Sequence, residues 1–458
     1  MESQPLLQKT SKLSFVENRG HDEVSENKHV KLEFFKLPRR KKYILVFCMA
    51  AEFYSGCSFS IMAPFYPKEA ARKEMSASLI GFIFSIFELI IFISSPIIGA
   101  NLTRIGSKFV FLSGIIIGGF CTILFGLLNR CPPGPPFIAL SFVTRSIQGL
   151  GFSSFVTSSF AIVSSEFPAH VSTAFGMLQT CVGTGLMLGP VIGGALYQLG
   201  GFGLPFYVIG ASVIINGLLV CSFLPDPDDA PKSKRQNSIF SLVRRPSVFI
   251  PMLSICTGAL GITYMEPTLA NHLEPFQLAP IIVGLFFVIS PLMNSLSSPI
   301  WGHLTDTKNN IQGPILVSNH FIYGIAFLLI GPSPLLPFVP FQIWILIIGL
   351  ALVGFTFASI LINSMKCMVL GALGQGFEDN LDTYGIVAGL FNSMYTLGGF
   401  VGPMLGGILS EELGPSFGFT VVGLLAIVMS LIVFCFFVIR NHRRGHPCTQ
   451  IGPPREKC

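Results

Sequence analysis

Charged residues are scarce in this sequence. Only 11% of the 458 residues are Asp, Glu, Lys or Arg, and 51% are hydrophobic. A typical soluble domain has roughly 25% charged residues. This composition excludes an ordinary water-soluble globule and indicates a protein that lies in a lipid bilayer.

The sequence also lacks the motifs of enzymes and ATP-driven pumps. It contains no phosphate-binding GxxxxGK[ST] loop, no HExxH and no paired metal ligands, and no polar segment is long enough for a catalytic domain. We therefore expect no enzyme activity, cofactor or metal. The net charge of +6 does not indicate a nucleic-acid partner, because basic residues beside apolar segments more often set membrane topology.

Twelve apolar stretches reach the ~17 residues that are needed to cross a membrane. They lie near 43–66, 79–100, 109–129, 137–161, 173–199, 203–223, 248–270, 281–301, 313–331, 341–364, 384–409 and 418–440. The predicted fold is an all-α membrane protein of twelve transmembrane helices. Its predicted units are a disordered N-terminal tail (1–42), two six-helix bundles (43–223 and 248–440), a linker (224–247) and a C-terminal tail (441–458).

Basic residues predict the orientation. With twelve spans, both tails and the linker lie on one side of the membrane, and most of the basic residues outside the spans are in these three segments. The positive-inside rule then places both termini and the linker in the cytosol.

A glycine-rich pattern occurs twice. Gly183 to Gly194 contains Gly-Pro-x-x-Gly-Gly, with Gly185, Gly189, Pro190 and Gly193, and the same pattern returns 213 residues later with Gly402 and Pro403. Small residues at this spacing allow close helix packing, and proline loosens one helical turn. One such pattern is ordinary membrane packing, but two copies in matching places indicate a duplicated unit.

Other segments repeat with an offset of 203 residues. Gly81 to Gly99 and Gly284 to Gly302 agree at nine of nineteen positions. Two six-helix units in the same order resemble the major facilitator superfamily, and this resemblance implies two bundles that rock about a central site. The first copy of the glycine pattern, Gly183 to Gly194, resembles the antiporter motif of that superfamily. The run Arg145-Ser-Ile-Gln148-Gly149 resembles the motif of its fourth span.

The loop signature of the superfamily, G-x-x-x-D-R-x-G-R-K, has two counterparts. The first begins at Gly99 and keeps Arg104, but Thr103 stands where the acid is usual, whereas the second keeps the acid as Asp306. The resemblance implies that these loops hold the cytosolic side closed, with a weaker first copy. We expect Lys366, at the cytosolic end of its span, to extend toward the membrane surface.

Three further runs resemble the vesicular amine transporter family, and within it the polyamine-transporting B branch. They are 59–70, 106–111 and 376–391. The resemblance covers about residues 43–440. It implies a proton-coupled antiporter that loads organic amines, among them spermine and spermidine, into acidic vesicles. Composition and spacing alone indicate only a two-bundle exchanger.

Four charged residues lie inside the predicted spans: Glu52, Glu88, Arg145 and Glu266. Each needs a partner or a wet cavity, because an ionised group at the bilayer centre costs roughly 2.5–3.5 kcal/mol. Glu88 either exchanges a proton for an ammonium group or forms a structural bridge with Arg145. Glu266 either holds a second amine or is a solvated acid at a helix end. Glu52 is a third candidate for proton coupling or substrate binding, although the resemblance implies no requirement for an acid at this position.

Arg145 is expected to organise the charges instead of binding a cation. Tyrosine rings can attract cations, and the candidates are Tyr54, Tyr264, Tyr384 and Tyr395. Packing in the core or against lipid is the alternative for each of them.

The N-terminal tail contains an acidic dileucine pattern formed by Glu2, Leu6 and Leu7. It is either a chance match or a signal that sorting adaptors read, and a real signal would direct the protein to intracellular vesicles. Two other functions stay open. They are proton-coupled export of another organic cation, monoamine or drug, and a sensor or scaffold role without transport.

Overall fold

The computed structural model describes residues 38–223 and 239–444, except 309–310, 332, 334, 337 and 413. The Glu2–Leu7 pattern and most of both predicted tails lie outside the described residues. The described part of the chain is almost entirely helical and contains no strand. Long uninterrupted apolar runs account for this, because a helix satisfies all its backbone hydrogen bonds within one segment in lipid.

The helices of the first half begin at Arg39 and end at Phe223. They are α2 (Arg39–Ser60), α3 (Met62–Arg72), α4 (Ala77–Ile105), α5 (Ser107–Leu127), η1 (Leu128–Arg130), α6 (Pro135–Glu166), η2 (Pro168–His170), α7 (Val171–Gly200) and α8 (Gly203–Phe223). The predicted span 43–66 is divided near Ile61, because Pro64 has no N–H to donate to the carbonyl four residues earlier.

The second half repeats this order. It contains α9 (Ile239–Val243), α10 (Pro246–Leu273), η3 (Glu274–Phe276), α11 (Pro280–Thr307), α12 (Gln312–Ile330), α13 (Ile343–Leu373), α14 (Leu381–Glu412) and α15 (Pro415–Arg444). The short α9 lies in the predicted linker, and α15 continues four residues beyond the predicted end of the last span.

The prediction of twelve long helices is confirmed. Eleven of them are long and apolar enough to cross a membrane by length and composition, and α14 is the twelfth. Polar residues such as Asn392 and Thr396 make α14 less apolar, and both are buried inside the protein.

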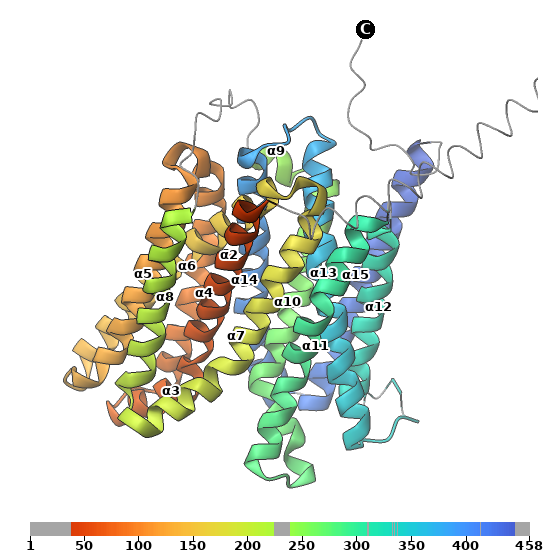
Figure 1. The fold of residues 1–458 in the computed structure, drawn as a ribbon. Helices are drawn as coiled ribbons and strands as arrows, with labels where there is room; N and C mark the ends of the chain where they lie inside the picture. Colours follow the sequence, from red (N-terminus) through yellow and green to blue (C-terminus); the bar gives the residue numbers. More distant parts are fainter. Residues whose placement is uncertain are drawn as a thin grey trace, which may run out of the picture.

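The long helices run side by side, with α5, α6 and α8 toward one side of the picture, α11, α12, α13 and α15 toward the other, and α14 between α4 and α10 (Figure 1). We call the end at which α2 begins and α15 ends the tail end. Helices α4 and α14 join the two halves along one line, and α7 and α11 join them along another. A Cβ atom on Gly385 would lie 2.8 Å from the carbonyl oxygen of Gly99, so these residues bring the backbones of α4 and α14 close together.

The repeated glycine pattern forms matching contacts in the two halves. Gly185 and Gly189 on α7 contact α2, and Gly398 and Gly402 on α14 contact α10. A Cβ atom on Gly189 would lie 3.0 Å from the Cα of Cys57, and one on Gly402 would lie 2.6 Å from the carbonyl oxygen of Leu260.

The pattern also includes Pro190, Gly193 and Pro403. Both prolines lie inside their helices, and Gly193 is buried. The duplication read from the sequence is therefore present as pseudo-symmetric helix packing.

Candidate functional site

Glu88 lies on α4 at the line where the two halves meet. Its side chain is half-buried and points to α14, because a Cβ atom on Gly399 would lie 3.4 Å from its Oε2. Glycine at this place leaves room for the carboxyl group. Arg145 and Glu266 are the charged groups that act on it electrostatically.

Glu266 belongs to the other half of the molecule, on α10. It is exposed, and it lies beside Pro267, which interrupts the hydrogen-bond pattern of the helix. Tyr395 on α14 is within electrostatic reach of both Glu88 and Glu266. The structure therefore brings together four of the predicted site residues: Glu88, Glu266, Arg145 and Tyr395.

Arg145 on α6 is fully buried. Its guanidinium carbon lies 3.8 Å from the ring centroid of Phe87 and 5.6 Å from that of Phe59, and its NH1 donates to Oε1 of Gln148 at 2.7 Å. Its Nε and NH2 have no hydrogen-bond partner.

The alternative of a structural bridge to Glu88 is not supported. Among the described residues no ion pair within 4.0 Å joins Arg145 to Glu88. Cation–π contacts with Phe87 and Phe59 hold the guanidinium instead.

Glu52 is separate from this group. It is 1% exposed and lies on α2, where Ser159 of α6 faces its carboxyl group. Both Glu52 Oε1 and Ser159 Oγ are buried and have no hydrogen-bond partner among the described residues.

Two of the four tyrosine candidates are also placed elsewhere. Tyr264 is fully buried, with its ring against Phe419 of α15, so it belongs to the core of the second half. Tyr384 lies in the first turn of α14 and donates to Asp379, near the tail end. Core packing, the alternative left open for these rings, describes Tyr264.

The second copy of the loop signature closes the tail end between α7 and α11. Asp306 accepts hydrogen bonds from the backbone N–H groups of Ser172 and Thr173, at 3.2 and 2.6 Å, in the first turn of α7. A carboxylate in this place satisfies free N–H groups and complements the helix dipole. Lys366 of α13 forms an ion pair with Asp306 at 3.1 Å, so it does not extend to the membrane surface as predicted.

The first copy closes the tail end in a different way. Thr103, which stands in the position of the usual acid, donates its hydroxyl to the carboxylate of Asp382 in the first turn of α14. The acid is thus present on the opposite helix. Arg104 is exposed in the last turn of α4, and Gly106 makes the turn into α5 with a φ of 98°, which glycine adopts without strain.

The profile of the Major Facilitator Superfamily matches residues 48–376. The chain belongs to the major facilitator superfamily. This confirms the resemblance that the loop signatures and the glycine pattern indicated. As its relatives in the superfamily are transporters, this multi-pass membrane protein is a transporter and not an enzyme.

Several relatives in the superfamily are similar over most of the chain. The MFS-type transporter SLC18B1 of Homo sapiens is 36% identical and covers 90% of this chain and 90% of its own length. That of Rattus norvegicus is 35% identical, covering 91% and 92%. The synaptic vesicular amine transporter of Mus musculus is 24% identical, covering 78% of this chain and 66% of its own length.

A solved structure in the superfamily has the same fold. The human organic anion transporter MFSD10 (TETRAN) aligns with a TM-score of 0.68 and 17% sequence identity, over 87% of this chain and 100% of that one. At this identity the likeness concerns the fold alone.

Two residues could not be predicted from the sequence: Gly399, which faces Glu88, and Asp382, which binds Thr103 at the tail end. Gly399 belongs to the second glycine pattern, and nothing in that pattern indicates that it faces Glu88. Asp382 lies in one of the runs that resemble amine transporters. The absence of an acid at position 103 was the one sequence feature that pointed to an acid on another helix.

Proposed function

We propose that this transporter exchanges protons for organic amines, with polyamines such as spermine and spermidine as substrates, and loads them into acidic vesicles. The tail end faces the cytosol in this proposal. Glu88 binds either a proton or an ammonium group, so the two exclude each other and move in opposite directions.

The observation that carries the proposal is the place of Glu88. Its carboxyl group is half-buried, lies at the line between the two halves, and has no ion pair with Arg145. A carboxylate there can take a proton from an acidic lumen or a cation from solution. The exposure of Glu266 and the contacts of Asp306 and Thr103 fit a site that is reached from the end opposite the tails.

Two carboxylates also suit a polyamine. Glu88 and Glu266 come from different halves, and Tyr395 lies within reach of both. A substrate with several ammonium groups can bind the two acids at once, whereas a monoamine can bind only one of them. The similarity to SLC18B1 and to the vesicular amine transporters supports an amine substrate.

The test is uptake of labelled spermidine into liposomes that contain the purified protein and have an acidic interior. The native protein is expected to concentrate spermidine, and a proton ionophore is expected to abolish the uptake. Glu88→Gln is expected to reduce uptake to the level of empty liposomes. Glu274→Gln is the matched control, because Glu274 is an exposed acid in η3 outside the group.

Three results would contradict the proposal. Concentrative uptake by Glu88→Gln would exclude Glu88 as the coupling group. Uptake of labelled serotonin or tetraethylammonium without uptake of spermidine would favour export of another cation. No gradient-driven uptake of any of these amines would favour a role without transport.

A further inference from the structure

We propose that Thr122 on α5 is a positioning residue, which fixes the amide of Gln148 and through it the guanidinium of Arg145. The inference rests on the proposed function for its effect on transport. Its structural part stands on four hydrogen bonds inside the first half of the molecule, two of which join α5 to α2 and to α6.

The hydroxyl of Thr122 is fully used. It lies 2.8 Å from the carbonyl oxygen of Gly118, which can only accept, so Thr122 donates its one proton there. Its oxygen then accepts from Nε2 of Gln148 at 3.1 Å and from the hydroxyl of Ser58 at 2.6 Å. One donor and two acceptor sites are thereby occupied.

This arrangement fixes the orientation of the Gln148 amide. With the NH2 group bound to Thr122, the amide oxygen faces Arg145 and accepts from its NH1 at 2.7 Å. The reversed amide would place donors against the donors of the guanidinium. Thr122 therefore ensures that Arg145 meets an acceptor while its guanidinium carbon lies 3.8 Å from the ring centroid of Phe87.

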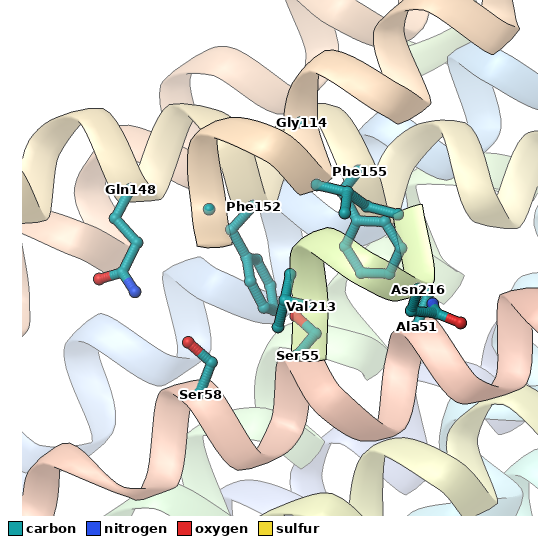
Figure 2. A pocket seen from close by; sticks show the side chains of 11 residues that line it. Ala51, Ser55, Ser58, Gly114, Gln148, Phe152, Phe155, Val213 and Asn216 are labelled. Atoms are coloured by element: carbon teal, nitrogen blue, oxygen red, sulfur yellow. The ribbon is translucent and has the colours of Figure 1, made fainter. Parts of the chain in front are cut away.

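The network is shielded from solvent. Thr122 is 1% exposed, Gln148 5% and Arg145 0%. Behind it lies a small cavity, lined by Ser55, Ser58, Gln148 and Asn216 among others, and Figure 2 shows the Gln148 amide and the Ser58 hydroxyl extending into the same space. The hydrogen bonds of Thr122 hold the Gln148 amide in one orientation at the edge of this cavity.

The position of Arg145 matters because its charge acts on Glu88. A cation beside the carboxylate competes with a bound ammonium group and promotes its release. If the guanidinium turns away, the amine is held longer at Glu88. Loss of the Thr122 hydroxyl should therefore lower both the maximal rate of uptake and the KM.

The decisive comparison is between Thr122→Val and Thr122→Ser. Valine keeps the shape and loses the hydroxyl, whereas serine keeps the hydroxyl. Thr122→Val is expected to reduce the maximal rate of spermidine uptake by about tenfold, the factor that corresponds to losing the hydrogen bond between Gln148 and the Arg145 guanidinium, and to lower the KM. Thr122→Ser should restore both values. A raised KM, or equal behaviour of the two variants, would overturn the proposal.

A second measurement does not need transport. Melting temperatures of the detergent-solubilised protein are compared for Thr122→Val, Arg145→Met and the double variant, and coupled residues give a non-additive result. Thr122→Val is expected to lower the melting temperature of the native protein much more than that of Arg145→Met. If Arg145→Met does not fold, Gln148→Met replaces it in the same cycle. Additive effects would refute the network even in a protein that transports spermidine, and non-additive effects would support it in a protein that does not.

Discussion

At the residue scale, two acids from different halves of the chain lie within electrostatic reach of one tyrosine. Glu88 on α4 and Glu266 on α10 both act electrostatically on Tyr395 of α14, and in the described part of the chain the cation Arg145 acts on Glu88. Glu266 is exposed and Glu88 is half-buried, so the two acids differ in how far the protein covers them. In the proposed function this difference suits separate tasks, in which Glu88 would exchange the proton and Glu266 would select the substrate.

Glu266→Gln should change selectivity more than coupling. In this variant a polyamine loses one of the two carboxylates that bind its ammonium groups. Because a hydrogen bond between charged groups contributes about 1.5–3 kcal/mol, we expect the KM for spermidine to rise roughly tenfold or more. The KM for a monoamine should stay nearly unchanged. Both values come from initial uptake rates in proteoliposomes, with Glu274→Gln as the control. An equal rise for both substrates would show that Glu266 does not distinguish them.

At the scale of the helices, two different types of contact connect the elements. Within each half, glycines allow α7 to approach α2 and α14 to approach α10. Between the halves at the tail end, Asp306 binds the first turn of α7, and Asp382 in the first turn of α14 accepts from Thr103. A rocking motion of the two halves would break these polar contacts and the close approach of Gly99 to Gly385, and would keep the glycine contacts within each half.

Alanine substitutions can separate the packing glycines from the others in the same pattern. A Cβ atom on Gly398 would lie 2.8 Å from the backbone nitrogen of Leu260, and one on Gly185 3.0 Å from that of Cys57, so Gly398→Ala and Gly185→Ala should each destabilise the protein by about 1–3 kcal/mol. Gly407→Ala is the control, because its Cβ atom would meet nothing within 4 Å.

The readout for these variants is the melting temperature of the detergent-solubilised protein. It should fall for Gly185→Ala and Gly398→Ala. For Gly407→Ala it should stay the same or rise slightly, since alanine favours a helix by up to ~1 kcal/mol over glycine. The same fall in all three variants would mean that helix packing at these glycines is not what the pattern provides.

At the scale of the whole molecule, the fold has one end at which α2 begins, α9 lies and α15 ends (Figure 1). The described basic residues Arg39, Arg245 and Arg444 lie where α2 begins, before α10 and where α15 ends, so we propose that this end faces the cytosol. A cytosolic N-terminus would expose the acidic dileucine pattern to sorting adaptors. We therefore propose that the protein lies in the membrane of intracellular vesicles.

Replacing Leu6 and Leu7 with alanine should move the full-length protein from vesicles to the cell surface. The reason is loss of the pattern that adaptors read, while the helices stay unchanged. Surface biotinylation of intact cells measures the effect, and replacing the neighbouring Gln8 and Lys9 with alanine is the control. Unchanged surface levels would show that the pattern is a chance match.

The sequence predicts the helices well and their neighbours poorly. Twelve apolar stretches and the repeated glycine pattern are sufficient for the fold, because both properties are local. The surroundings of Glu88 depend on which helix lies opposite, and no local pattern shows that Gly399 is that neighbour. Tyr264 illustrates the limit, since a ring on the same helix as Glu266 turns into the core against Phe419.

The burial of Arg145 has an electrical consequence. Its charge is held against the rings of Phe87 and Phe59 and stays in the protein, so in the proposed cycle the site has a net charge of one negative when both acids are ionised. One bound proton makes the site neutral, and two make it positive. Since moving one elementary charge through 100 mV involves about 2.3 kcal/mol, membrane voltage would act on a return step with two protons and not on one with a single proton.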